Sequence, residues 1–300
     1  MFSHPLFIAS IPPTLFMLGI LGFLLLRSAR EERPFLALLM LIEWPMHFVS
    51  SYGVRKPLNH FLDSVLPPTE LPSMILRSFQ APLVEESFKL VLIFLAYFLS
   101  RLNTQNAIRT GMIVGASFGL SEVWSLAYLF AQDPAAAGHP WYHYLAFVQE
   151  RTMVAPIHGV FAVAAAVGIA KGGRSIVVGV LTGMGLHYLA NFPILLAKLD
   201  IGHLGKNVWG VVLALYISLY TVAMYVLLIY YVYGKAVLRK LMSGIARCPE
   251  CNATYQRPRT RVNVGPFLSY EKCTQCNKSH WIRLKDLQDP PGQSAPAAAS

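Results

Sequence analysis

Charged residues occur inside an apolar stretch where a membrane helix would carry none. The run 81–94 reads APLVEESFKLVLIF and holds Glu85, Glu86 and Lys89. A charged side chain at the centre of a membrane helix costs about 2.5–3.5 kcal/mol on insertion scales. Lys89 is spaced i, i+4 from Glu85 and i, i+3 from Glu86, so its ammonium can reach either carboxylate. This pairing would neutralise one acid and leave the other available for acid–base chemistry.

Later apolar stretches add polar groups at comparable depth. They are Glu122 in FGLSE, His158 in APIHG, and His187 with Asn191 in HYLAN. Small residues that allow helices to approach closely surround them: Gly111, Gly115, Ala116, Gly119, Gly159, Ala162, Gly179, Gly183 and Gly185. We therefore expect four helices to bring these groups to one buried point. A carboxylate in such a low-dielectric cavity binds protons more readily, which suits it to activate water.

The composition points to the lipid bilayer as the environment of these groups. Of 300 residues, 55% are hydrophobic and 13% are charged, against about a quarter charged in soluble domains. The stretches that approach or exceed the length needed to cross a membrane are 6–26, 35–53, 74–99, 107–131, 142–170, 175–198 and 207–233. The predicted fold class is thus an all-α polytopic membrane protein of about seven transmembrane helices. Because Glu150 and Arg151 open the fifth stretch, residues 142–153 are either part of that span or a separate lip helix.

Basic residues predict the orientation in the membrane. They gather after the first, third and fifth stretches: Arg27, Arg30, Arg33, Arg101, Arg109, Lys171 and Arg174. The positive-inside rule makes these loops cytoplasmic and the loops 54–73 and 132–141 external. We therefore expect a multi-pass protein of the cell membrane with its N-terminus outside and its C-terminus in the cytoplasm. No Lys or Arg precedes Arg27, so the first stretch is predicted to be a retained span.

The chain is predicted to divide at the end of the last span. Residues 1–233 form the membrane domain, 234–247 a basic juxtamembrane linker, 248–285 a compact module, and 286–300 a tail expected to be disordered. Residues 235–289 contain eleven Lys or Arg against four Asp or Glu. Anionic lipid headgroups attract such a segment when it follows a membrane helix, so contact with the bilayer is favoured and nucleic-acid binding is not expected.

All four cysteines lie in two CxxC pairs, Cys248 with Cys251 and Cys273 with Cys276. Each pair can present two thiolates to one tetrahedral ion, which is the spacing of a zinc ribbon. Two disulfides, a redox pair or an iron site are the alternatives, and the cytoplasmic placement disfavours disulfides. We predict a structural Zn²⁺, because four thiolates leave no open coordination position.

The metal is expected to hold a small core together and to make the module a docking platform for a cytoplasmic protein partner. Tyr255, Phe267 and Trp281 are the predicted core aromatic residues. His280 is predicted to be a surface histidine, since the four cysteines already complete the site.

Taken in order, EESFK at 85–89, FGLSE at 118–122, His158 and HYLAN at 187–191 resemble the PrsW family of intramembrane proteases. This family lies within the superfamily that includes the CAAX prenyl endopeptidases. The resemblance covers about residues 30–200 and implies a membrane enzyme that cuts membrane-anchored proteins, such as anti-sigma factors. In the prenyl endopeptidases the position of Glu122 is usually a histidine, so the chain is more similar to PrsW. The cysteine module is outside the common family core.

The chemistry of these residues agrees with peptide hydrolysis. Glu85 is the preferred general base, with Glu86 oriented by Lys89. His158 could position the water, with Glu122 tuning it, while His187 and Asn191 could donate hydrogen bonds to the oxyanion.

Two alternatives remain open from the residues alone. A catalytic Zn²⁺ held by Glu122, His158 and His187 would also generate hydroxide, although we favour the metal-free mechanism. A transporter or ion sensor could use the same buried acids, but the absence of an evident repeat disfavours it. Glu43 and His47, spaced i, i+4, are interpreted as a structural pair.

Overall fold

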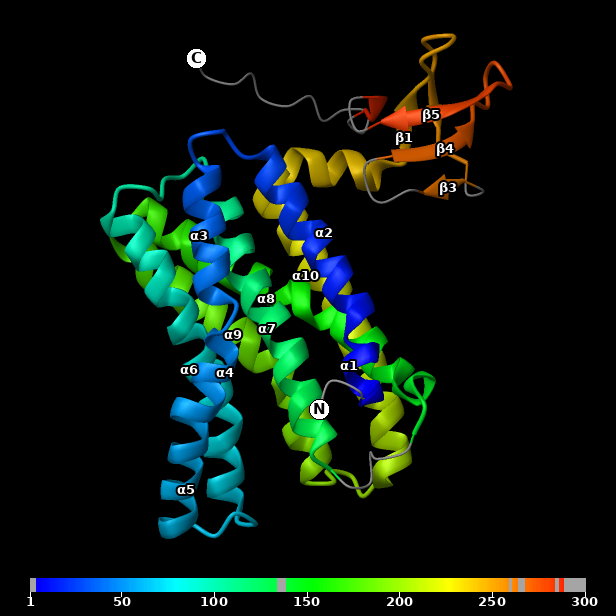
Figure 1. Ribbon diagram of the computed structural model, residues 1–300. Coiled ribbons are helices and arrows are strands. Elements are labelled where there is room, and N and C mark those ends of the chain that lie inside the picture. Colours follow the sequence, from blue (N-terminus) through cyan, green and yellow to red (C-terminus); the bar gives the residue numbers. More distant parts are fainter. Residues whose placement is uncertain (1–3, 134–138, 259–260, 264–267, 284–285, 289–300) are drawn as a thin grey trace. The chain divides into compact units, whose positions relative to one another are not determined.

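The computed structural model divides into two compact units, residues 1–225 and 226–300. It describes residues 4–133, 139–258, 261–263, 268–283 and 286–288. The first unit is helical. The second contains the end of the last long helix, followed by short β-strands (Figure 1).

The helical elements follow one another through short connections. In chain order they are α1 (Pro5–Ala9), α2 (Ile11–Arg27), α3 (Arg33–Glu43), α4 (Met46–Phe48), α5 (Lys56–Val65), α6 (Leu71–Phe98), α7 (Ala107–Ala131), α8 (Leu145–Lys171), α9 (Arg174–Lys198) and α10 (Gly205–Ser243). A π-helix, Val49–Arg55, joins α4 to α5, and a 3₁₀ turn, Trp141–Tyr144, leads into α8. π-Helical turns are rare in proteins, and those that occur are often located at functional sites.

Helices α7 and α8 form the centre of the helical unit. In the most apolar 18-residue stretch of each span, 78% of residues are buried for α8 and 67% for α7, against 11% for α10. Glycines permit this close packing: a Cβ added at Gly115 would lie 2.1 Å from the backbone oxygen of His158. A Cβ at Gly119 would lie 2.2 Å from the backbone oxygen of Ala155. The small residues therefore bring the backbone of His158 directly against α7.

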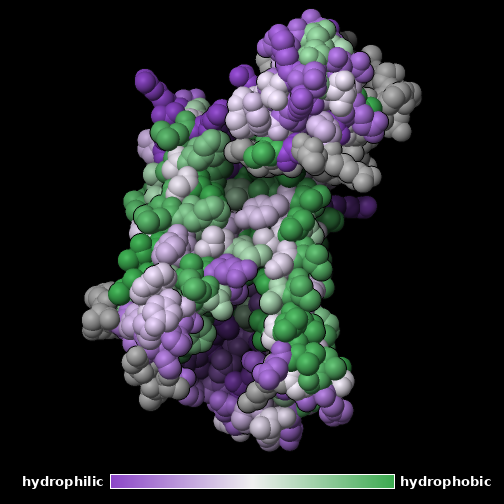
Figure 2. Space-filling model, turned by 90° about the vertical axis from the view of Figure 1, so that its right-hand side faces the viewer, coloured by the Kyte–Doolittle hydropathy of each residue, from purple (hydrophilic) through white to green (hydrophobic). Residues whose placement is uncertain are grey.

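Among the described residues, six segments are long and apolar enough to cross a membrane. They are Pro5–Arg27, Arg33–Val65, Ala107–Ala131, Trp141–Lys171, Arg174–Lys198 and Asn207–Val232. Helix α6 has 28 residues, which is also long enough, but the charged residues in its middle exclude it by composition. Many large apolar side chains of these helices are exposed, and apolar residues cover much of the face drawn in Figure 2. The predicted all-α polytopic fold is confirmed, with six candidate membrane spans among the described residues where about seven were predicted.

One helical segment differs from the prediction, and another decides between two predicted alternatives. The second predicted stretch continues through the π-helix and α5 to Val65, so residues 54–65 are helical rather than loop. Helix α8 runs without a break from Leu145, so Glu150 and Arg151 belong to it and no separate lip helix forms. Arg151 can lie inside the helical unit because it pairs with Glu122 on α7.

The C-terminal unit contains two small antiparallel sheets. Strand β1 (Ile245–Arg247) pairs with β2 (Thr254–Gln256), and β4 (Leu268–Lys272) pairs with β3 (Val262–Asn263) on one side and β5 (Ser279–Arg283) on the other. Helix α10 extends through residues 234–243 of the predicted linker. The strand module begins at Ile245, three residues before its predicted start. It also includes Leu287, which is buried, forms a bridge with Ala246 and lies in the segment predicted to be a tail.

Buried and exposed side chains alternate along β5, and this pattern corrects two predictions for the core of this module. His280 is 8% exposed and lies near Tyr255 at an Nε2 to Oη distance of 3.3 Å, so it is not a surface histidine. Trp281 is 47% exposed and packs against Tyr270 on the outer face. Successive side chains of a strand point to opposite faces, so His280 and Ile282 enter the core while Trp281 leaves it. Tyr255 is buried as predicted, and Phe267 lies outside the described residues.

Candidate active site and cysteine cluster

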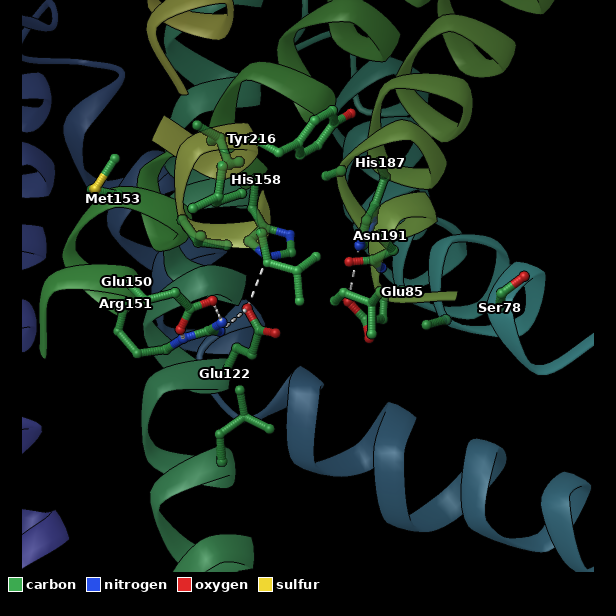
Figure 3. A pocket seen from close by; sticks show the side chains of 18 of the residues that line it. Ser78, Glu85, Glu122, Glu150, Arg151, Met153, His158, His187, Asn191 and Tyr216 are labelled. Atoms are coloured by element: carbon green, nitrogen blue, oxygen red, sulfur yellow. Dashed lines mark hydrogen bonds and ion pairs between the residues drawn. The ribbon is translucent and has the colours of Figure 1, made fainter. Parts of the chain in front are cut away.

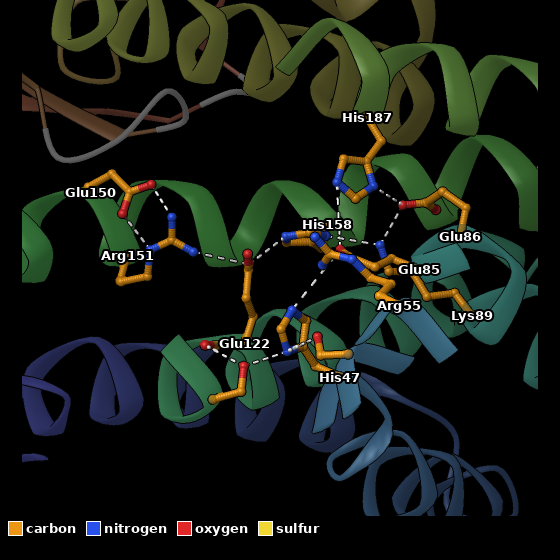
Figure 4. Close-up of polar contacts among 12 residues, drawn as sticks. His47, Arg55, Glu85, Glu86, Lys89, Glu122, Glu150, Arg151, His158 and His187 are labelled. Atoms are coloured by element: carbon orange, nitrogen blue, oxygen red, sulfur yellow. Dashed lines mark hydrogen bonds and ion pairs between the residues drawn. The ribbon is translucent and has the colours of Figure 1, made fainter. Parts of the chain in front are cut away.

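Polar side chains from four long helices meet at one buried point (Figure 4). Helix α6 contributes Glu85, Glu86 and Lys89, α7 contributes Glu122, α8 contributes His158, and α9 contributes His187. All of them except Glu122 are at most 3% exposed. Buried charges are stable only when they are paired, so the partners of each group define the chemistry of the site.

Lys89 pairs with Glu86 and not with Glu85. Its Nζ lies 2.5 Å from Oε1 of Glu86 and 2.9 Å from Nδ1 of His158. The same Glu86 oxygen lies 2.6 Å from Nδ1 of His187. An ionised carboxylate only accepts hydrogen bonds, so Nδ1 of His187 donates and Nε2 of the neutral ring is left as an acceptor.

Glu85 has a partner from outside the predicted set. Nη1 of Arg55 donates to Oε1 of Glu85 at 2.6 Å, and Nε2 of His47 lies 3.8 Å from the same oxygen. The other oxygen, Oε2, faces Nε2 of His187 at 3.7 Å. This distance exceeds that of a direct hydrogen bond. Two acceptor atoms thus face each other with room for a group that binds both.

Glu122 joins His158 to a second arginine that the sequence interpretation did not use. Its Oε2 lies 2.9 Å from Nε2 of His158 and 3.1 Å from Nη1 of Arg151. Arg151 also pairs with Glu150. Arg151 precedes His158 by seven residues on α8, so both side chains lie on the same side of that helix. This i, i+7 spacing is a signal that could have identified Arg151 from the sequence.

His47 belongs to the site and not to the predicted pair with Glu43. Nδ1 of His47 contacts the hydroxyl of Ser125, and its ring packs edge-on against Phe118. Glu43 is fully buried, and among the described residues neither of its carboxylate oxygens has a hydrogen-bond partner. The i, i+4 spacing placed both residues on one side of the segment but could not show which neighbours each would meet.

A cavity of about 860 Å³ reaches this cluster (Figure 3). Its walls include Glu85, Glu122, His158, His187 and Asn191. Asn191 lies one helical turn after His187 on α9, as its spacing predicts. On the face drawn in Figure 2, a hollow with hydrophilic walls opens between apolar helices. A buried polar cluster at the wall of such a cavity is the arrangement expected of a reactive site.

The donor atoms of three residues could hold a metal ion. One atom each of Glu85, His158 and His187 lie within 4.8 Å of one another. Each imidazole has a carboxylate at one nitrogen, Glu122 for His158 and Glu86 for His187, as metal-binding histidines commonly have. A metal at Nδ1 of His158 would replace its contact with Lys89. These residues fit an ion, and the set contains Glu85 where the sequence interpretation placed Glu122.

The four cysteines form a second, separate cluster built from two matching turns. In the first turn the amide of Cys248 donates to the oxygen of Ala253, and in the second the amide of Cys273 donates to the oxygen of Lys278. Asn252 and Asn277 occupy equivalent positions, each four residues after the first cysteine of its pair, with φ of 59° and 63°. Asn tolerates this left-handed conformation better than most residues, which explains its presence in both turns.

The sulfur positions suit a tetrahedral ion. Cys248 and Cys276 have their Sγ atoms 3.7 Å apart, and Cys251 and Cys273 have theirs 4.0 Å apart. A tetrahedron with metal–sulfur bonds of about 2.3 Å has edges of about 3.8 Å. All four ligand atoms lie within 4.8 Å of one another, and no disulfide links these cysteines. The module therefore has a four-cysteine cluster that could bind a metal.

Comparison with known families agrees with the motifs and the geometry. Residues 33–232, two thirds of the chain, match the model of the PrsW family, described as intramembrane metalloproteases. Comparison with curated proteins and with solved structures gives no match. The family match covers α3 to α9 and most of α10, and so includes each of the helices that form the cluster. The chain is therefore a multi-pass membrane protein and belongs to the PrsW family of intramembrane metalloproteases.

Proposed function

We propose that this protein is an intramembrane endopeptidase that hydrolyses peptide bonds of membrane-anchored proteins at Glu85. The observation that carries the proposal is the opposition of Oε2 of Glu85 and Nε2 of His187 at 3.7 Å beside the cavity. Both atoms accept hydrogen bonds in the neutral form of His187, and a polar separation longer than 3.5 Å can be bridged by a water. A water that donates to both would be held in place for attack on a carbonyl group.

In this mechanism Glu85 accepts a proton from the attacking water, and the oxygen of that water bonds to the carbonyl carbon of the substrate. The proton is then passed to the nitrogen of the leaving amine as the C–N bond breaks. His187 orients the water through Nε2. Glu86 keeps His187 in the required tautomer, and Lys89 neutralises Glu86. His187 was predicted to donate to the oxyanion; in the neutral form of the ring, with Nδ1 donating to Glu86, Nε2 instead accepts. The amide of Asn191 remains as the donor for that role.

The family description supports an alternative to this mechanism, in which a metal ion and not Glu85 activates the water. Glu85, His158 and His187 would hold this ion, and a divalent ion bound there would make the attacking water a stronger acid. The sequence interpretation favours a metal-free reaction. The shared donor set and the carboxylates behind both histidines instead support a metal-assisted one.

The cavity supports a peptide substrate that reaches the site from within the membrane. It is bordered by residues of α6, α7, α8, α9 and α10, and its walls combine apolar side chains with the polar cluster. By the distribution of basic loops we infer that the N-terminus is external and that the C-terminal module is cytoplasmic. Four thiolates in tetrahedral arrangement support a structural Zn²⁺ in that module, which could serve a cytoplasmic protein partner.

The test is a comparison of protein termini in membranes of cells that express the wild-type chain or Glu85→Gln at equal abundance. Glu31→Gln, which changes an exposed acid in a loop, is the matched control. We expect fragments of membrane-anchored proteins that are present with wild type and Glu31→Gln and absent with Glu85→Gln. Identical termini in all three, with a folded Glu85→Gln variant, would reject the protease and favour a transporter or sensor.

A further inference from the structure

The two adjacent acids of α6 have separate cations. Lys89, three residues after Glu86 on the same helix, forms an ion pair with Glu86. Glu85 forms an ion pair with Arg55, which lies in the π-helix thirty residues earlier in the chain. The side chain of Glu85 is 4% exposed, and its Oε1 lies 2.6 Å from Nη1 of this guanidinium. A carboxylate beside a second carboxylate in a buried site would otherwise be strongly disfavoured.

The contact with Arg55 distinguishes the two oxygens of Glu85. Oε1 accepts from Nη1 of Arg55 at 2.6 Å, and His47 also approaches this oxygen. Oε2 is the oxygen that faces His187 at 3.7 Å. A charge-assisted hydrogen bond of this length restrains the carboxylate rotation that would exchange the two oxygens. In Figure 4, Arg55 and His187 approach Glu85 from different elements.

Helix α6 also binds the backbone that carries Arg55. Nε2 of Gln80 donates to the backbone oxygen of Arg55 at 3.2 Å, and Gln80 is 5% exposed. Gln80 precedes Glu85 by five residues, so α6 contacts Arg55 at both its backbone and its side chain. The π-helix ends at Arg55, which lies at the wall of the cavity. The segment that delivers the guanidinium is therefore one that departs from α-helical geometry.

We propose that Arg55 is a positioning residue that holds Glu85 with Oε2 directed at the reacting water. This proposal rests on the proposed function of the same site. The π-helix supplies the cation for Glu85, because Lys89, the cation of α6 beside the two acids, pairs with Glu86. Arg55 takes no part in proton transfer and acts only through the orientation and charge of Glu85.

The experiment measures cleavage kinetics of the purified full-length protein in lipid nanodiscs. The probe is a transmembrane peptide containing the most abundant Glu85-dependent cut found in the comparison of termini. Arg55→Gln is expected to lower kcat about 100-fold with KM nearly unchanged, because small misplacements of a reactive group cost about this much. Arg55→Lys keeps the positive charge but replaces the planar guanidinium by an ammonium group, and its kcat is expected to lie between those of wild type and Arg55→Gln. Lys56→Gln alters the exposed neighbouring cation and is expected to behave as wild type.

Chemical rescue separates positioning from a merely structural role. Methylguanidinium is expected to restore part of kcat to Arg55→Ala, since it can enter the cavity and contact Glu85, and to leave Glu85→Gln inactive. Full kcat in Arg55→Gln, a loss confined to KM, or no rescue of a folded Arg55→Ala would overturn the proposal. If Arg55→Gln does not fold, Arg55→Lys replaces it in the test, and unchanged kcat in that variant would overturn the proposal. Absence of any Glu85-dependent cut would instead reject the proposed function.

Discussion

The Nζ atom of Lys89 lies 2.5 Å from Oε1 of Glu86, with both side chains almost completely removed from solvent. Removal of one partner of a buried ion pair typically costs about 3–5 kcal/mol, because the remaining charge has no compensation. We therefore expect Lys89→Met to destabilise the protein by about this amount. The double variant Lys89→Met with Glu86→Gln should recover a large part of the loss.

The measurement is unfolding of the purified protein in detergent. Lys278→Met is the control, because Lys278 and Glu250 form an exposed pair at 3.6 Å. Exposed pairs contribute about 0–1 kcal/mol. A Lys89→Met variant as stable as the Lys278→Met control would show that Lys89 does not compensate Glu86.

Close packing of α7 against α8 predicts a strong effect at Gly115. A Cβ there would lie 2.1 Å from the backbone oxygen of His158, so Gly115→Ala must push the two helices apart. Overpacking of this kind typically costs about 1–3 kcal/mol. We expect lower thermal stability together with slower cleavage, since His158 moves with α8. Gly185→Ala is the matched control, because nothing lies within 4 Å of a Cβ at that position. Equal behaviour of the two variants would contradict the contact.

Two separate donor sets predict two metal ions per chain. Elemental analysis of the purified protein should find about two equivalents, one in the four-cysteine cluster and one at Glu85, His158 and His187. Cys248→Ser should lose the first, and His187→Ala should lose the second and abolish cleavage. If the wild-type protein holds only the ion of the cysteine cluster and cleaves its substrate after metal chelation, Glu85 acts on water without a metal.

The buried tyrosine of the cysteine module predicts a sensitivity to alkaline pH. Burial raises the pKa of the Tyr255 hydroxyl, and its hydrogen bond to the Glu271 carboxylate raises that pKa further. The folded module therefore keeps the proton above pH 10, near where an unfolded tyrosine begins to lose it. Stability from this group is complete below about pH 10 and decreases as pH rises above it.

Metal transfer from the module to a chelator provides the measurement. Between about pH 10 and 11.5, the transfer rate should increase more steeply in wild type than in Tyr255→Phe, which has no proton to lose. Parallel pH profiles for the two proteins would show that Tyr255 does not contribute. The comparison removes effects of other groups that titrate in this range, because both proteins share them.

Local patterns in the sequence were sufficient for most of the helices and for the two cysteine turns. Long apolar stretches predicted the membrane helices because lipid requires each backbone group to be satisfied within its own helix. The two CxxC pairs predicted the four-cysteine cluster because each pair closes its own turn. Glycines such as Gly115 predicted close packing because only helices without a Cβ at the contact can approach so near. Each of these features is indicated by a pattern of residues that lie close together in the sequence.

Contacts between distant segments were decided by the tertiary structure alone. The spacing of Glu85, Glu86 and Lys89 allowed Lys89 to reach either acid. In the structure Lys89 pairs with Glu86, and Arg55 of the π-helix pairs with Glu85. His280 was expected at the surface until the register of β5 placed it inside. Side-chain spacing defines which residues share a face of an element. It does not define what that face meets, because partner choice depends on how separate elements pack and on which buried charge each cation can reach.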